Sequence, residues 1–212
     1  MKERKAKYSG ILLAAGNSSR MKKWKIEIEI QNVPLLFHSL KKLETVCDEV
    51  IVVGGCNFDK LVELIERNKI VETKNIKVIC NQQYQTGMFS SIKAGAEIAQ
   101  HENVFIALAD MPFISIETYN LLKTKFEAEK KYDFIQPAML LENGKRKKGH
   151  PVLINEKVKS TIKKGNDTLT LRDVLKKFSG NSFLSEDLGI GFDIDTETDL
   201  LNAEKIFYKK MN

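Results

Sequence analysis

A short apolar run that breaks abruptly into small polar residues constrains this chain more than any other feature. Ile11–Ala15 has no polar alternation, which is the pattern of a β-strand buried on both faces of a sheet. Gly16-Asn17-Ser18-Ser19 follows at once, and its small side chains can leave backbone N–H groups pointing outward. Several cations come next, among them Arg20, Lys23 and Lys25. Because exposed N–H groups and cations both favour phosphate oxygens, the segment predicts a polyphosphate-binding loop at the end of a strand.

The following part of the chain alternates expected strands and helices. Apolar runs predict strands at 49–53, 76–80 and 103–109, and helical spacing predicts helices at 35–46, 59–68, 89–99 and 115–130. This alternation is typical of a parallel sheet covered by helices on both faces. Right-handed crossovers would place the phosphate loop at the carboxyl end of the first strand. The 212 residues fit one such domain, spanning 1–212.

Weaker patterns complete the expected fold. Ile26–Ile30 alternates strictly and predicts a half-exposed strand, and further strands are expected at 133–137 and 188–194. Asn143-Gly144 predicts a hairpin turn beside four consecutive cations, 145–148, for which a solvated turn is an equally good account. A helix is expected at 169–178, with Asp167 or Thr168 as its N-cap, and a final helix ends near Tyr208.

Two more segments follow buried strands and carry polar groups. The loop from Asn81 to Ser91 opens the helix at 89–99, so that a helix amino terminus could meet an anion or a base edge, although a simple capped helix is the alternative. Asp110 ends the strand at 103–109, and Pro112 stops the strand behind it. A carboxylate in that position is costly unless compensated, and Mg²⁺ bound to a nucleoside triphosphate is its natural partner. The alternative is an aspartate that caps the helix at 115–130.

Several of these motifs resemble a known family. Leu13-Ala14-Ala15-Gly16, followed by Ser18, Arg20-Met21 and Lys25, resembles the signature loop of the molybdenum cofactor cytidylyltransferase family, within the MobA-like nucleotidyltransferase superfamily. The resemblance extends to Asp110-x-Pro112, to Gly149-His150-Pro151, to Arg172 in an arginine position, and to Asp193-Ile194-Asp195-Thr196 with Asp199-Leu200. It covers nearly the whole chain, from Ser9 to Leu200.

The resemblance implies a fold, a reaction and roles for named residues. The fold would be an α/β, Rossmann-like, three-layer nucleotidyltransferase of the nucleotide-diphospho-sugar transferase type, with a mixed but mostly parallel sheet. The reaction would move CMP from CTP to the phosphate of a molybdopterin-type cofactor, with Mg²⁺ as cofactor and pyrophosphate as the second product. Arg20 and Lys25 would stabilise the leaving pyrophosphate, and Asp110 with Asp193 or Asp195 would hold the metal. Nucleotide contacts would come from Leu13, Ala14, Ala15, Gly16, Asn81, Gly87 and Ser91, and acceptor contacts from Gly149 and His150.

Two alternatives and two departures accompany the resemblance. The chain could act on a sugar or lipid phosphate, or it could be a non-catalytic nucleotide-binding protein that serves a molybdenum hydroxylase or its accessory factor. Lys22 stands where the family has glycine, and a positive φ there would cost on the order of 1 kcal/mol. Asn32 also replaces a glycine, but asparagine tolerates left-handed backbone well.

Net charge, cysteine spacing and the lack of long apolar segments indicate which kinds of ligand and which cellular compartment to expect. The net charge of +6 suits a polyanion, and no nucleic-acid motif accompanies it, so we expect a nucleotide or a phosphorylated cofactor and no nucleic acid. Cys47, Cys56 and Cys80 lack paired metal spacing and predict buried thiols in a reducing compartment. Met1 to Tyr8 lacks an apolar signal region and no run reaches membrane-spanning length, so we expect a cytoplasmic protein without a membrane partner.

Overall fold

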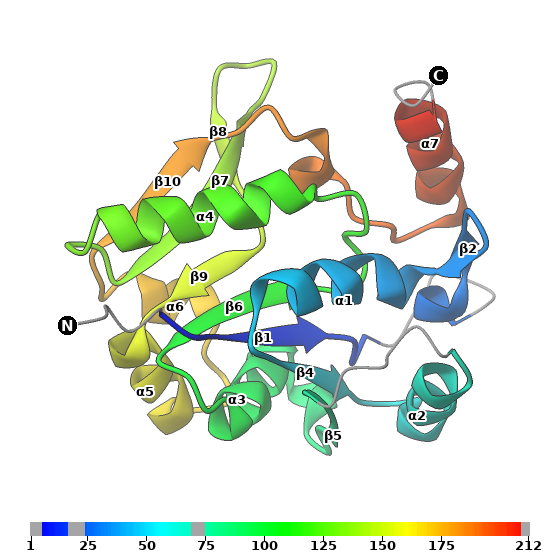
Figure 1. Cartoon of the computed structure of the whole chain (residues 1–212), viewed down its shortest axis with the longest axis horizontal. Coiled ribbons are helices and arrows are strands. Elements are labelled where there is room, and N and C mark those ends of the chain that lie inside the picture. The colour runs from blue at the N-terminus through cyan, green and yellow to red at the C-terminus, as the bar shows by residue number, and fades with distance from the viewer. Residues whose placement is uncertain (1–5, 17–23, 69–74, 209–212) are drawn as a thin grey trace.

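A mixed β-sheet forms the centre of the computed structural model, which describes residues 6–16, 24–68 and 75–208 (Figure 1). Within these residues, eight strands join the sheet in the order β10-β7-β9-β6-β1-β4-β5, and β8 pairs with β7. Their bounds are β1 Tyr8–Leu13, β4 Glu49–Gly54, β5 Ile76–Cys80, β6 Asn103–Leu108, β7 Phe134–Leu140, β8 Arg146–Lys148, β9 Val152–Ile154 and β10 Gly180–Leu184. Most pairs are parallel, and the antiparallel ones involve β8 and β9. The predicted fold class is therefore confirmed.

The first predicted strand lies at the middle of the sheet. β1 pairs in parallel with β4 on one side and with β6 on the other, so that Ile11 lies opposite Ile51 and Ile106. All six residues of β1 are buried, as the unbroken apolar run predicts for a strand covered on both faces. The carboxyl ends of β1, β4 and β6 therefore meet at one edge of the sheet.

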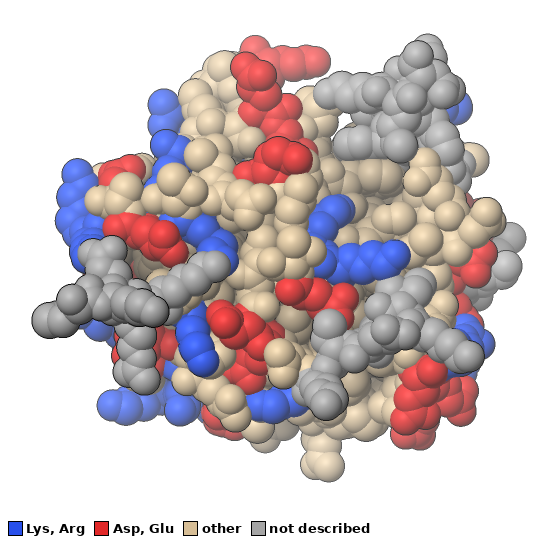
Figure 2. Space-filling model, in the orientation of Figure 1, with Lys and Arg blue, Asp and Glu red and all other residues tan. Residues whose placement is uncertain are grey.

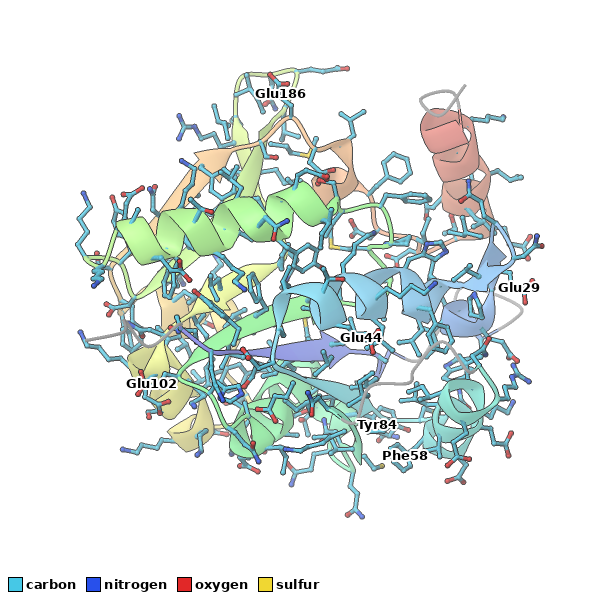
Figure 3. All side chains as sticks on the ribbon, viewed as in Figure 1. Glu29, Glu44, Phe58, Tyr84, Glu102 and Glu186 are labelled. Atoms are coloured by element: carbon cyan, nitrogen blue, oxygen red, sulfur yellow. The ribbon has the colours of Figure 1, made fainter. Side chains whose placement is uncertain are left out.

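Helices cover both faces and make three layers. α1 (Leu35–Val46), α2 (Phe58–Arg67) and α4 (Ile116–Ala128) pack on one face, around a core that includes Leu40, Leu61 and Tyr119. α3 (Met88–Ile98), α5 (Glu156–Lys164) and α6 (Leu171–Leu175) pack on the other, around Phe89 and Ile162. Figure 3 places Glu102 at the amino end of β6, whereas Tyr84 and Phe58 lie toward the opposite end of the sheet, where the phosphate loop begins.

The expected strand at Ile26–Ile30 is wrong. Lys25–Glu27 is instead a 3₁₀ turn (η1), and only Glu29–Ile30 (β2) is extended, paired with Val33–Pro34 (β3). Lys25 and Ile26 are both buried, and adjacent residues of a strand would point to opposite faces. The turn between β2 and β3 includes Asn32 at φ 58°, so the left-handed conformation expected at that departure is confirmed. Lys22, the other departure, lies outside the described residues.

The expected last strand at Leu188–Ile194 is also wrong. Leu188–Gly191 forms a 3₁₀ turn (η3), and 192–195 has no regular structure before α7 (Glu197–Tyr208). A Cβ on Gly189 would lie 2.3 Å from the backbone carbon of Phe113, so the chain crosses that backbone at close range instead of pairing with a strand. The final helix is confirmed.

The prediction of the hairpin at 143–144 was confirmed, and that of the helix at 169–178 was confirmed only in part. The hairpin at Asn143-Gly144 is confirmed, since β7 and β8 pair across it and Gly144 has φ 75°. The helix expected at 169–178 is shorter and is capped by Thr170, which exchanges hydrogen bonds with Asp173. Asp167 instead pairs with Lys93 at 3.1 Å. Helix α5 and strand β10 were not predicted.

Two of the three expected buried thiols are wrong. Cys56 and Cys80 are exposed, because Cys80 ends the edge strand β5 and Cys56 follows the neighbouring strand β4 out of the sheet. Cys47 is half-buried. Among the described helices, none is both long and apolar enough to span a membrane.

Candidate active site

The predicted phosphate loop begins where β1 leaves the sheet. Backbone bonds from Ala14 N–H to the Val53 carbonyl and from Ala109 N–H to the Leu13 carbonyl, at 2.9 and 3.0 Å, extend the pairing past the strand ends. Ala14 is buried, Ala15 half-buried and Gly16 exposed, so the chain reaches the surface at Gly16. Arg20 lies outside the described residues. The loop therefore starts at the predicted edge of the sheet.

Three charged side chains meet beside this loop. The Lys25 Nζ lies 2.8 Å from Asp110 Oδ2 and 2.8 Å from Asp195 Oδ1. Only 11% of the Lys25 side chain is exposed, against 27% for Asp110 and 43% for Asp195. Burial opposes the charged amine, but the two carboxylates outweigh it and raise the pKa of Lys25. Lys25 is therefore a partly buried ammonium ion bridging two carboxylates.

Backbone geometry brings these distant residues together. The Ile194 N–H donates to the Asp110 carbonyl at 2.9 Å, and the buried Ile194 side chain anchors the segment that carries Asp195. Asp199 accepts bonds from the N–H groups of Asp195 and Thr196, which fixes the start of α7. Asp195 therefore reaches Lys25 from an irregular segment and not from the strand expected at 188–194.

Asp110 has the donor atom that a metal site needs. Its Oδ1 is buried and has no hydrogen-bond partner among the described residues. It does not cap α4, because Ser115 accepts the N–H of Thr118 there. No group of three His, Cys, Asp or Glu side chains suited to a metal occurs in the described part of the chain. A Mg²⁺ ion that takes one or two carboxylates and completes its shell with phosphate oxygens and water fits this donor set.

The amino end of α3 forms a second polar surface at this edge. Gly87 precedes the helix with φ 127°, and no side chain of the described residues caps its first turn. The buried Asn81 donates to the hydroxyls of Ser90 and Ser91 at 2.8 and 2.9 Å, and it accepts the N–H of Gln83. The side chain of Asn81 thus orders the loop, and the helix amino terminus stays open for an anion or a base edge.

Gly149 and His150 form a third part of the site, within the electrostatic reach of Asp110. A Cβ on Gly149 would lie 2.4 Å from Ile190 Cγ2, so the backbone there must be glycine to pack against η3. The His150 Nδ1 lies 3.2 Å from the Ile106 carbonyl. Burial lowers the pKa of His150, although that bond and the negative charges of Asp110 and Asp193 oppose the shift. Asp193 thus acts on His150, whereas Asp195 reaches Lys25.

On the face drawn in Figure 2, the charged side chains of the described residues form no extended belt of one sign. Figure 2 shows Lys and Arg side chains interspersed with Asp and Glu over the face that it draws.

The site itself combines a phosphate-type loop, two carboxylates and an open helix amino terminus around one edge of the sheet. Together these groups can bind a metal-bound polyphosphate and hold a second ligand near His150. Sequence reasoning missed Gln136, a polar residue within the apolar run of β7, which lines the cavity beside His150.

The chain is similar to proteins that transfer nucleotides. The family model described as the MobA-like NTP transferase domain matches residues 10–182. The molybdenum cofactor cytidylyltransferase of Escherichia coli (strain K12) is 30% identical, over 92% of this chain and 94% of that protein. The probable molybdenum cofactor guanylyltransferase of Bacillus cereus (strain AH187) is 24% identical, over 94% and 97%. A solved structure of CMP-2-keto-3-deoxy-manno-octonic acid synthetase with CTP covers 97% of this chain at a TM-score of 0.76 and 11% identity, covering 100% of that chain, which shows a shared fold.

Proposed function

Because this chain belongs to the MobA-like NTP transferase domain family, we propose that it transfers CMP from CTP to the phosphate of a molybdopterin-type cofactor and releases pyrophosphate. Nucleotidyl transfer in molybdenum cofactor biosynthesis follows from the family and its relatives. The choice of CTP and the need for Mg²⁺ are the proposed parts. The observation that carries the chemistry is the meeting of Lys25, Asp110 and Asp195 beside the phosphate loop.

The mechanism needs positioning and charge more than proton transfer. The acceptor phosphate attacks the α-phosphorus of the nucleotide in line, and the bond to the pyrophosphate oxygen breaks. A phosphate dianion is already nucleophilic, so no general base is required. When bound, Mg²⁺ would neutralise charge on the triphosphate, held by Asp110 and Asp195. Lys25, and Arg20 from the phosphate loop, would stabilise the negative charge that develops on the leaving pyrophosphate.

The preference for CTP rests on two observations. The cytidylyltransferase relative is 30% identical over 92% of this chain, whereas guanylyltransferase relatives reach 30% over 58% of the chain or 24% over 94% of it. In addition, the turn at Gly87 leaves the first N–H groups of α3 without a side-chain cap from the described residues, and Asn81 holds the buried Ser90 and Ser91 behind them. A mismatched base that covered these N–H groups would leave them unpaired and would therefore be rejected.

Competition tests the choice of nucleotide. Equal concentrations of labelled CTP and GTP are mixed with the protein, Mg²⁺ and molybdopterin, and the labelled dinucleotide products are separated. The proposal expects CMP transfer to dominate, with pyrophosphate formed in equal amount. Preferential GMP transfer would contradict the CTP assignment, and absence of either product would contradict nucleotidyl transfer to this acceptor.

A further inference from the structure

The connection from β6 to α4, residues 109–115, carries Asp110 and is held by a row of backbone carbonyl groups. The carbonyls of Asp110 and of the next two residues all accept hydrogen bonds. The first accepts the Ile194 N–H at 2.9 Å, the second accepts the Ser39 hydroxyl at 3.3 Å, and the third accepts the ammonium group of Lys42. Ser39 and Lys42 both belong to α1, which lies beside this connection on the face that it shares with α4 (Figure 1). Helix α1 therefore holds the backbone directly behind Asp110.

Lys42 occupies its position at a cost in solvation. The residue is half-buried, and within the described part of the chain it makes no ion pair. Burial lowers the pKa of Lys42 to about 8, although the negative charges of Asp187 and Glu117 oppose the shift. An apolar side chain of similar length would bury its stem without desolvating a charge. Packing alone therefore does not account for a lysine here, whereas the bond to the Pro112 carbonyl does.

Separate contacts fix the far end of the same connection. Asp187 Oδ2 accepts the N–H of Ser115 at 2.8 Å and the hydroxyl of Thr118 at 2.6 Å. A Cβ on Gly189 would lie 2.3 Å from the backbone carbon of Phe113, so the chain of η3 covers that residue closely. These contacts act from residue 113 onward. The bonds from α1 are therefore the ones that restrain the two residues next to Asp110.

The direction of the Asp110 carboxylate depends on this backbone. Its Oδ2 bonds to Lys25 at 2.8 Å, and its buried Oδ1 has no hydrogen-bond partner among the described residues. Catalytic groups need to be held within about 0.5 Å of their working position, and a displacement of about 1 Å can slow a reaction by about 10²-fold. A carboxylate with one bonded oxygen needs support from the chain behind it.

We propose that Lys42 is a positioning residue whose bond to the Pro112 carbonyl fixes, through the backbone, where the Asp110 carboxylate meets Lys25 and Mg²⁺. The part that concerns Mg²⁺ rests on the proposed function, whereas the part that concerns Lys25 does not. Lys42 acts only through Asp110 and contacts no reacting atom. None of the sequence motifs includes Lys42.

A double-mutant cycle in thermal denaturation at pH 7 tests the position of Asp110 without any ligand. If Lys42 positions Asp110, then Lys42→Met already weakens the interaction that Lys25→Met removes. The fall in Tm caused by Lys25→Met should therefore be at most about half as large in the Lys42→Met protein as in the wild type. Lys42→Arg keeps a charged donor and should restore most of that fall. Lys41→Met is the matched control, because Lys41 is exposed on the same helix, and it should leave the fall unchanged.

Nucleotide binding measures the same positioning in the presence of a ligand. By calorimetry, Lys42→Met should raise the Kd for CTP about tenfold in Mg²⁺ and leave it unchanged in EDTA. In the Asp110→Asn protein, Lys42→Met should have no further effect, because the carboxylate through which it acts is gone. An equal rise of the Kd in Mg²⁺ and in EDTA would mean that Lys42 acts on the nucleotide by another route and would overturn the proposal.

The outcomes separate this inference from the proposed function. If Lys25→Met lowers Tm by the same amount with and without Lys42→Met, Lys42 does not position Asp110. If Lys42→Arg reduces the fall as much as Lys42→Met does, packing and not the donated bond is the cause, and the proposal is again overturned. If the wild type fails to transfer CMP while the Tm changes remain coupled, the positioning role stands and the proposed function falls. Normal CMP transfer with additive Tm changes would leave the proposed function standing without the positioning role.

Discussion

Replacing Lys25 by methionine should leave two carboxylates facing each other across the site. In the folded protein the Lys25 ammonium lies 2.8 Å from both Asp110 and Asp195. Methionine keeps most of the volume and the apolar stem but removes the charge and its hydrogen bonds. The carboxylates would then repel each other in a site where Asp110 Oδ1 is already buried without a partner among the described residues. The folded state should therefore lose stability at neutral pH.

The size of the loss follows from the exposure of the three side chains. Removing one partner of a fully buried ion pair costs about 3–5 kcal/mol. Here the Asp195 side chain is 43% exposed and the Asp110 side chain 27%, so solvent screens part of the interaction and we expect about 2 kcal/mol. For a chain of this size, that loss corresponds to a fall in Tm of about 4–8 °C.

The pH dependence identifies the cause. The pKa of Lys25 is raised in the folded state, so its charge contributes fully below its ordinary value of 10.5 and is lost only as the pH rises through the higher folded value. The Lys25 charge is therefore fully present from about pH 6 to pH 9, and the Tm difference between the wild type and the variant should stay constant over that range. The difference should narrow only as the pH rises above 10.5.

Thermal denaturation from about pH 6 to pH 11 measures this effect. Lys41→Met is the matched control, since Lys41 is an exposed lysine on α1, and it should change Tm by less than 1–2 °C. A Tm deficit in Lys25→Met that is absent at pH 7, or that has already disappeared at pH 9, would refute the reasoning.

Three other substitutions address separate parts of the site. Asp110→Asn should abolish turnover with the fold intact, and it should weaken nucleotide binding measured by calorimetry far more in Mg²⁺ than in EDTA; equal activity would remove Asp110 from the site. Gly149→Ala should lower the free energy of unfolding by about 1–3 kcal/mol, because the added Cβ would lie 2.4 Å from Ile190 Cγ2. Chemical denaturation measures this loss. If a second substitution, Ile190→Ala, does not relieve the loss, its cause is not this contact. Asn81→Ala should lower the free energy of unfolding by about 1–3 kcal/mol, measured in the same way, because Ser90 and Ser91 lose the amide that orders them. It should also raise the nucleotide Kd. An unchanged Kd would mean that this loop does not contact the nucleotide.

Buried strands were the part of the fold that sequence could predict. β1, β4 and β6 each contain an uninterrupted apolar run, since each strand is covered on both faces, and the short length of these runs favours strands over helices. Helix α5 escaped notice because one of its buried positions is Lys159, whose Nζ donates to the His101 carbonyl at 2.7 Å. A buried lysine breaks the apolar periodicity on which helix prediction depends.

The site was predicted in its parts but not in its arrangement. Motifs indicated Lys25, Asp110 and Asp195 separately, with lysine toward phosphate and aspartate toward metal. Their meeting depends on the backbone bond between Ile194 and Asp110 and on the 3₁₀ turn at Lys25–Glu27, which join segments as far as 170 residues apart. Gln136 has a weaker sequence signal, one polar residue in an apolar strand, and its meaning depends on the cavity that α6 completes.

The position of the label after transfer tests the central claim most directly. CTP labelled at the α-phosphorus or at the γ-phosphorus is incubated with molybdopterin, Mg²⁺ and the protein, and products are separated. Nucleotidyl transfer predicts that the α-label enters the pterin product while the γ-label leaves as pyrophosphate, with neither seen in Asp110→Asn. Entry of the γ-label into the pterin, or release of the γ-label as inorganic phosphate, would contradict attack at the α-phosphorus.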